Sequence, residues 1–256
     1  MRSFQPKFLV RLVRSKADLY AVQRLRYDIF VGELGAANSN CGNEPYLETD
    51  LFDQHCIHLM LLDCALGDTV DKQIVGTYRV LTEAGASRVG GFYSSSEFNL
   101  SSLLKSNRRL IELGRSCLRP AYRGGNAMYH LWQALADVIL EEGAEVLFGV
   151  ASFSGTDVTE LAQPLSYLSM AHMAPEPLRP RSLTLEMAPA WQLRESEIDR
   201  LTAIKATPSL IKAYLRLGGG IGDGIYIDKN FNTTDVCLVL DTQKMNPRQK
   251  AIYLRK

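Results

Sequence analysis

Residues 110–128, LIELGRSCLRPAYRGGNAM, place a β-patterned run directly before a glycine-rich turn and a helix start. Pro120 ends the apolar run, and residues 127–140 repeat large apolar side chains at helical spacing. The first N–H groups of a helix lack carbonyl partners within it and favour phosphate groups. Arg123 lies beside this turn. The segment therefore predicts an α/β fold in which a strand leads into an anion-binding turn.

The remaining patterns extend this fold. Six further strands are predicted, at residues 8–13, 55–63, 73–81, 146–152, 183–187 and 225–228, with a seventh at 236–240. Further helices are predicted at residues 17–31, 158–173 and 195–217, the last with a break at Pro208. Residues 55–63 with 73–81, and 225–228 with 236–240, are expected to form hairpins. The sequence shows no repeat and no linker. We therefore expect residues 1–256 to form one α/β domain with a mixed, largely antiparallel sheet and a helical elaboration at 157–217.

The N-terminal apolar run contains Lys7, Arg11 and Arg14, which is unlike a signal peptide, and no apolar stretch approaches the ~20 residues that span a membrane. Five cysteines without a CxxC motif are typical of reduced thiols, so a cytoplasmic protein is expected. His55 and His58 fall on opposite faces of a predicted strand, so we expect no metal site. A net charge of +1 argues against nucleic acid as a partner.

Charge is sorted along the chain. Between Arg26 and Lys72 there are nine acidic residues and no Lys or Arg. Residues 105–123, in contrast, hold six basic side chains and one acid, Glu112. Each stretch could be a solvated surface or part of a binding site, and composition alone leaves both open.

The order strand, Pro, aromatic, Arg-Gly-Gly, helix resembles the thioester-binding segment of the GNAT acyltransferase superfamily. Its usual pattern is Arg/Gln-x-x-Gly-x-Gly/Ala, whereas this chain has Asn126 and Met128 at the later glycine positions. That departure suits a phosphopantetheine arm on a carrier protein, which has one phosphate and no adenosine. The resemblance implies a GNAT-like sheet and these donor-binding residues: Leu118, Arg119, Arg123, Gly124, Gly125 and Asn126.

Longer segments resemble the ornithine-acyl carrier protein N-acyltransferases. They are residues 25–36, 47–63, 111–125 and 214–241, and FNTTDV at 231–236 is the most specific piece. The resemblance implies transfer of a 3-hydroxyacyl group from an acyl carrier protein thioester to the α-amine of L-ornithine. The product would be lyso-ornithine lipid, in the first step of ornithine lipid biosynthesis. No cofactor is expected, because acyl carrier protein brings the acyl group as a substrate.

A looser resemblance joins the chain to acyl-homoserine lactone synthases and N-acyl amino acid synthases. It rests on four features. They are Arg-x-x-x-Phe (Arg26 and Phe30), an acidic pair (Asp50 and Asp53), an arginine at the end of a strand (Arg79) and Glu-x-x-Arg (Glu112 and Arg115). The resemblance implies Glu112 as the base that takes the amine proton. The competing interpretation is that Glu112 and Arg115 form a structural ion pair. We expect the acidic stretch to receive the ammonium groups of ornithine through Glu48, Asp50 or Asp53. Arg79 would then bind the carboxylate, and the absence of Trp before Trp132 counts against a lactone synthase.

Two alternatives remain open, an acyltransferase for another amine and a non-catalytic acyl-carrier or membrane-binding module. Acyl carrier proteins are acidic, so the basic residues of 105–123 would speed docking. An amphiphilic product also suggests peripheral contact with the inner face of the cytoplasmic membrane. The predicted contact lies in 157–217, at Leu161, Leu165, Tyr167, Leu168, Trp191 and Arg194. The alternative is that these side chains pack on the sheet.

Overall fold

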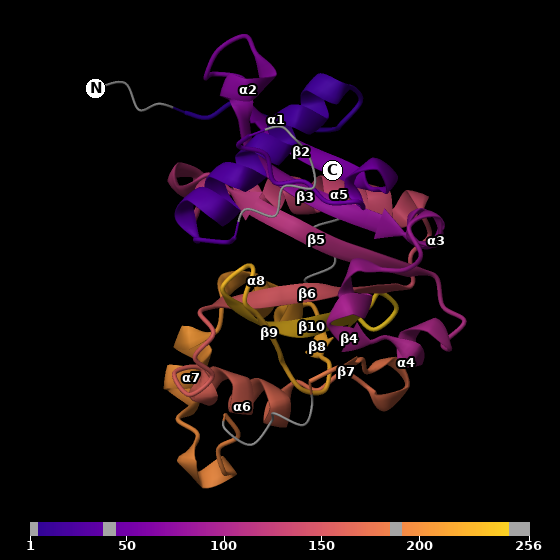
Figure 1. Ribbon diagram of the computed structural model, residues 1–256, viewed down its shortest axis with the longest axis vertical. Coiled ribbons are helices and arrows are strands. Elements are labelled where there is room, and N and C mark those ends of the chain that lie inside the picture. Colours follow the sequence, from indigo (N-terminus) through magenta and orange to yellow (C-terminus); the bar gives the residue numbers. More distant parts are fainter. Residues whose placement is uncertain (1–4, 38–44, 185–190, 246–256) are drawn as a thin grey trace.

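The computed structural model describes residues 5–37, 45–184 and 191–245. One sheet runs through it in the order β1-β2-β3-β5-β6-β10-β8, with β9 paired to β10 (Figure 1). Its strands are β1 (Phe8–Leu12), β2 (Ile57–Asp63), β3 (Ile74–Thr82), β5 (Leu110–Leu118), β6 (Val146–Ser154), β8 (Gly220–Ile221), β9 (Tyr226–Asp228) and β10 (Thr233–Asp241). All neighbours are antiparallel except β5 and β6. The sheet is thus mixed and largely antiparallel, as the sequence predicts.

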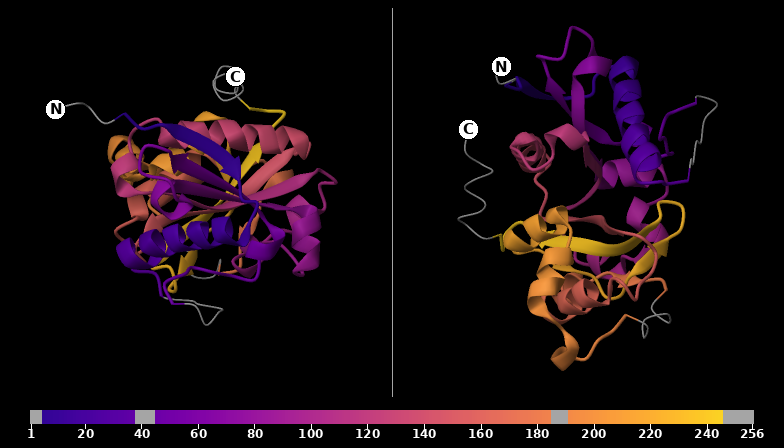
Figure 2. Two further views of the ribbon diagram at one scale, coloured as in Figure 1. Left: turned by 90° about the horizontal axis from the view of Figure 1, so that it is seen from above. Right: turned by 90° about the vertical axis from the view of Figure 1, so that its left-hand side faces the viewer.

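Helices cover both faces of this sheet (Figure 2). They are α1 (Lys16–Arg26), α2 (Val70–Gln73), α3 (Glu83–Arg88), α4 (Ser101–Leu104), α5 (Ala127–Glu141), α6 (Ala162–Ala171), α7 (Arg200–Ala206) and α8 (Ser209–Arg216). Helix α1 packs on Met60 of β2, whereas α5 packs on the neighbouring Leu59 and Leu61. Since successive side chains of a strand point to opposite faces, α1 and α5 lie on opposite sides of the sheet.

Strands β5 and β6 pair only at their beginnings, from Leu110 opposite Val146 to Glu112 opposite Phe148. Both strands then continue for six residues and diverge (Figure 1). At the point of divergence Gly149 has φ +157°, and a Cβ there would lie 2.1 Å from the Leu113 carbonyl oxygen. Glycine is therefore required for this close approach.

Most predicted elements are confirmed, including both hairpins, the strand–turn–helix unit and the break at Pro208. Most of the strand predicted at 183–187 lies outside the described residues, which omit 185–190. Its first two residues, 183 and 184, form a turn after the short strand β7 (Arg181–Ser182), which pairs with β4 (Phe98–Asn99). The helix predicted at 158–173 begins only at Ala162. His55 belongs to a 3₁₀ turn rather than a strand, and the His58 ring bonds the Asp53 carbonyl at 2.8 Å.

The predicted membrane-contact residues are largely core residues, so that prediction is wrong for this surface. Leu165 and Leu168 are 1% and 0% exposed and belong to the main hydrophobic core, as does Trp191. Tyr167 is also buried. An interfacial helix must present its apolar face to lipid, and α6 directs these side chains into the protein. Among the described residues, no helix is long and apolar enough to cross a membrane.

Candidate active site

A cavity of about 260 Å³ lies where β5 and β6 diverge. Its lining draws on both faces of the sheet. The apolar part belongs to the core under α5 and α8, with Leu113, Leu147, Leu210, Tyr214, Leu238 and Leu240. The polar part lies near the β3–β5 connection and the β9–β10 hairpin, with Arg79, Tyr93, Glu97, Glu112, Arg115, Asp228 and Asp235. A cavity with one apolar and one charged part suits a ligand that itself has an apolar and a charged part.

A bulge in β5 places Arg115 in this cavity. Opposite the bulge, the β3 register shifts between Thr77 and Arg79. Arg115 has φ +51°, a left-handed conformation that is unusual for a non-glycine residue. Such bulges redirect a side chain beside active sites. Here the guanidinium carbon lies 4.7 Å from the ring centroid of Tyr93 and 4.9 Å from that of Phe231.

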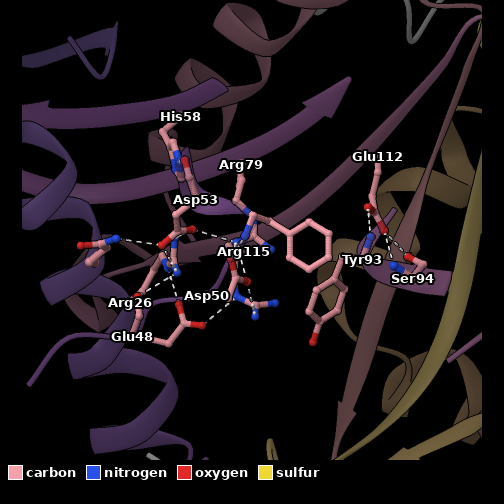
Figure 3. A network of polar contacts seen from close by, with 12 residues as sticks. Arg26, Glu48, Asp50, Asp53, His58, Arg79, Tyr93, Ser94, Glu112 and Arg115 are labelled. Carbon is pink, nitrogen blue, oxygen red and sulfur yellow. Dashed lines mark hydrogen bonds and ion pairs between the residues drawn. The ribbon is translucent and has the colours of Figure 1, made fainter. Parts of the chain in front are cut away.

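The acidic and basic residues predicted for the acceptor site converge in one ion-pair network (Figure 3). Arg26 donates to Asp53 at 2.8 and 3.1 Å and to a Glu48 side-chain oxygen. Arg79 Nη1 donates to Asp50 at 2.7 Å and to Asp53 at 2.8 Å. Arg115 joins the network through Glu48 at 3.0 Å and Asp50 at 3.1 Å. The charge sorting along the sequence thus reflects pairing between the acidic stretch and arginines of α1, β3 and β5.

Burial within this network is nearly complete for Arg26, Glu48 and Asp53, at 0%, 3% and 4% exposure. Burial opposes ionisation of Asp53, yet the adjacent charge of Arg26 outweighs it and the pKa of Asp53 is lowered. Arg79 and Arg115 line the cavity, as does Phe30, whereas the lining does not include Arg26, Glu48, Asp50 or Asp53. The carboxylates of Glu48, Asp50 and Asp53 are therefore partners of arginines, and they do not face the cavity as free carboxylates.

Glu112 is buried in the cavity wall and holds a neighbouring 3₁₀ turn, Tyr93–Ser96. Its Oε1 accepts the Ser94 N–H at 2.6 Å and the Ser94 hydroxyl, and its Oε2 accepts the Tyr93 N–H at 2.7 Å (Figure 3). Burial raises the pKa of Glu112, although these hydrogen bonds oppose the rise. No ion pair joins Glu112 to Arg115 among the described residues. Oε2 accepts one hydrogen bond and retains the capacity to take a proton.

The predicted donor site lies at the exposed turn between β5 and α5. Gly124 has φ +76°, which favours glycine, and α5 begins at Ala127 after Asn126. Arg123 donates to the Leu118 carbonyl at 3.0 Å and forms a bidentate pair with Glu33. Arg119 is partly exposed beside it and donates to the Asp71 carbonyl at 3.1 Å. The structure thus brings all six predicted donor residues to one helix start.

The basic stretch 105–123 does not form one patch, which corrects the docking surface predicted from its composition. Arg108 and Arg109 lie before β5, where Arg108 pairs with Glu145 and Asp241. Arg115 is held in the buried network, and Arg119 and Arg123 follow the other end of the strand. An extended strand separates its two ends by about 3.3 Å per residue, so adjacency in sequence becomes distance in space.

Sequence reasoning missed three acidic residues of the cavity, Glu97, Asp228 and Asp235. Glu97 follows the 3₁₀ turn held by Glu112, and Asp228 and Asp235 come from β9 and β10. Asp235 is part of FNTTDV, the segment singled out as most specific. Because side chains alternate along a strand, Asp235 is expected on the sheet face opposite to Val236, but nothing local connects it to Glu97.

Residues 25–133 match the family model for a GNAT acetyltransferase domain. The protein has the GNAT fold and is an N-acyltransferase. Over 247 residues it is 47% identical to an L-ornithine N(alpha)-acyltransferase of Rhodobacter capsulatus, covering 96% of this chain and 95% of that one. A Brucella abortus enzyme of the same name is 37% identical, with 95% and 88% covered. The chain belongs to the family of L-ornithine N(alpha)-acyltransferases.

Solved structures with similar folds include the acyl-homoserine lactone synthase LasI and the N-acyl amino acid synthase FeeM. LasI has a TM-score of 0.52 at 13% identity, with 97% of this chain and 95% of that chain covered. FeeM has a TM-score of 0.55 at 11% identity, with 94% of each chain covered. At these identities the likeness concerns the fold. It confirms the GNAT-like sheet predicted from the sequence.

Proposed function

We propose that this protein transfers a 3-hydroxyacyl group from the thioester of acyl carrier protein to the α-amine of L-ornithine. The observation that carries the proposal is the full-length relationship to enzymes named L-ornithine N(alpha)-acyltransferase. The product would be lyso-ornithine lipid. The cavity supports the proposal, because its apolar part suits an acyl chain and its charged part suits an amino acid.

The donor is proposed to enter from the turn at Gly124 and Gly125. The phosphate of a phosphopantetheine arm would lie at the start of α5, close to Arg119 and Arg123, where free N–H groups favour an anion. From there the arm would reach the space between β5 and β6. The acceptor carboxylate would lie near Arg79 and Arg115, both of which line the cavity.

Glu112 is proposed as the group that takes a proton from the α-ammonium, directly or through water. The freed amine then attacks the thioester carbon, and the tetrahedral intermediate collapses with cleavage of the C–S bond. The thiolate of the phosphopantetheine arm leaves and recovers a proton, and the amide remains. A buried carboxylate with a raised pKa is a better base for this step than one in water.

Mass spectrometry of a reaction containing the purified protein, ornithine and 3-hydroxyacyl carrier protein tests this proposal. We expect N-acylornithine as the product. A panel with lysine, glutamine or S-adenosylmethionine as the amine separates it from an acyltransferase for another acceptor. Thioester binding without turnover on any amine would contradict the proposal.

Charge reversal at the donor turn is expected to weaken the carrier protein selectively. Arg119→Glu combined with Arg123→Glu should raise KM for acyl carrier protein by about 10-fold more than KM for a short acyl-pantetheine, because the latter lacks an acidic protein surface. Higher salt should slow the wild-type reaction with the carrier, since exposed charges are screened beyond about 8 Å. Arg109→Glu, before the other end of β5, is the matched control and should leave both KM values unchanged. If KM rises equally for both donors, these arginines contact only the phosphate and not the surface of the carrier protein.

A further inference from the structure

Three carboxylates from separate parts of the chain converge in the charged part of the cavity. They belong to Glu97, which precedes β4, to Asp228 at the end of β9 and to Asp235 in β10. One oxygen from each lies within 4.8 Å of the others. All three residues line the cavity at the divergence of β5 and β6. They lie apart from the ion-pair network of Arg26, whose acidic members do not line it.

Two of these carboxylates are buried without full compensation. Glu97 is 3% exposed and Asp235 is 2% exposed. Oε2 of Glu97 and Oδ1 of Asp235 have no hydrogen-bond partner among the described residues. Burying an ionised carboxylate that lacks a partner is costly, and grouping several like charges adds repulsion. The cluster is therefore arranged for a cation that the protein itself does not supply.

The pKa values of Glu97 and Asp235 are both raised, as expected for buried carboxylates that lie close together. Burial raises the pKa of Glu97 to about 9, and repulsion from Asp235 and Asp228 contributes to the rise. Burial also raises the pKa of Asp235 to about 6. Arg115 lowers both values, but among the described residues its ion pairs are with Glu48 and Asp50 and not with Glu97 or Asp235. An entering positive charge would remove the repulsion and favour the ionised forms.

We propose that Glu97, Asp228 and Asp235 bind the side-chain ammonium group of the ornithine acceptor and so determine which amino acid is acylated. The inference rests on the proposed function. The α-amine is an unsuitable occupant, because a carboxylate partner stabilises the protonated form, which cannot attack a thioester. The side-chain amine does not react at this site and gains from remaining charged.

This assignment also orients the acceptor. Arg79 and Arg115 provide positive charge for its carboxylate, while the acidic cluster holds the far end of its side chain. The α-amine is left between these two groups and near Glu112. Each charged group of the amino acid thus meets the opposite charge in the same cavity.

The test compares ornithine with norvaline, which has the same carbon chain but no side-chain amine. The wild-type enzyme should prefer ornithine by at least about 100-fold in kcat/KM, because norvaline would leave the carboxylates unpaired. Glu97→Gln and Asp235→Asn should each lower kcat/KM for ornithine by about 100-fold. The same variants should leave the low kcat/KM for norvaline unchanged within about 3-fold, a range well below that expected for a lost charge pair.

Asp223→Asn is the matched control, since its carboxylate lies outside the cavity lining and is 4.0 Å from an exposed arginine, Arg181. It should leave both values unchanged. Equal losses for ornithine and norvaline in Glu97→Gln and Asp235→Asn would overturn the proposal. So would loss of wild-type activity in EDTA with recovery on adding Mg²⁺, Ca²⁺ or Mn²⁺, which would identify a metal site. A wild-type enzyme that acylates norvaline or another amino acid but not ornithine would instead refute the proposed function.

Thermal unfolding without substrate gives a readout independent of activity. Because the Glu97 pKa is raised in the folded protein, its contribution to stability is present at low pH and is lost as pH rises toward about 9. Asp228, Asp235, Glu112 and Arg115 are the charged groups that act on it. Glu97→Gln should therefore raise Tm relative to wild type at pH 8 and lose this advantage near pH 4. A Tm below wild type at pH 8 for both Glu97→Gln and Asp235→Asn would mark the carboxylates as structural and overturn the proposal.

Discussion

Replacing Glu112 by glutamine is expected to lower kcat by about 10²- to 10⁴-fold, the range typical of losing a general base. The α-ammonium of the acceptor must lose a proton before attack, and glutamine cannot accept one. The wild-type rate should fall as pH drops through the raised pKa of Glu112. In Glu112→Gln the inflection that belongs to Glu112 should be lost, and the remaining rate should fall with pH only as the fraction of free amine falls. Steady-state rates across pH 5–9 provide the measurement.

Ser94→Ala separates this role from the structural role of Glu112. The variant removes the hydroxyl that donates to Oε1 but keeps the base and the Ser94 N–H bond. Its rate should fall by less than about 10-fold, since one hydrogen bond is worth about 1 kcal/mol. If Glu112→Gln retains a near wild-type rate from pH 7 to 9, another group takes the proton. If Ser94→Ala loses as much as Glu112→Gln, the carboxylate acts by holding the 3₁₀ turn.

Arg26→Met is expected to reduce the free energy of unfolding by about 3–5 kcal/mol, because removing one partner of a buried ion pair leaves the other charge uncompensated. Arg26 is fully buried and is shared between Asp53 and Glu48. Methionine fills much of the volume, so the loss reflects charge rather than a cavity. Urea unfolding at neutral pH, followed by circular dichroism, measures it.

Arg24→Met on the same helix is the control, because Arg24 forms an exposed pair with Asp28 that contributes about 0.3–0.5 kcal/mol. The deficit of Arg26→Met should also depend on pH. The Asp53 pKa is lowered by Arg26, so its stabilising contribution is present above its unfolded pKa and is lost as pH falls toward the folded value. The difference between wild type and Arg26→Met should shrink in acid. A deficit that is small or independent of pH would contradict this account of the network.

The sequence by itself determined much of the sheet and the donor turn, because these depend on local order. Two apolar runs separated by a polar turn predict β2 and β3, and Pro120 with Gly124 predicts the break between β5 and α5. The resemblance carried by short motifs also named the residues that meet around Arg115. Local chemistry alone did not reveal the 3₁₀ turn at Tyr93–Ser96, which is held by Glu112 from another element.

Only the tertiary structure decided how the charges are used. The acidic stretch after Arg26 reads as a site for ammonium groups, yet Asp50 and Asp53 meet arginines that strand pairing brings beside them. The leucines of α6 read as a lipid-facing stripe, yet the helix turns them into the core. Glu97 and Asp235 are 138 residues apart and become neighbours through the β9–β10 hairpin and the β3–β5 connection. The sequence shows which charged residues are present. Which of them form ion pairs, and which are buried, depends on distances between residues that only the folded structure defines.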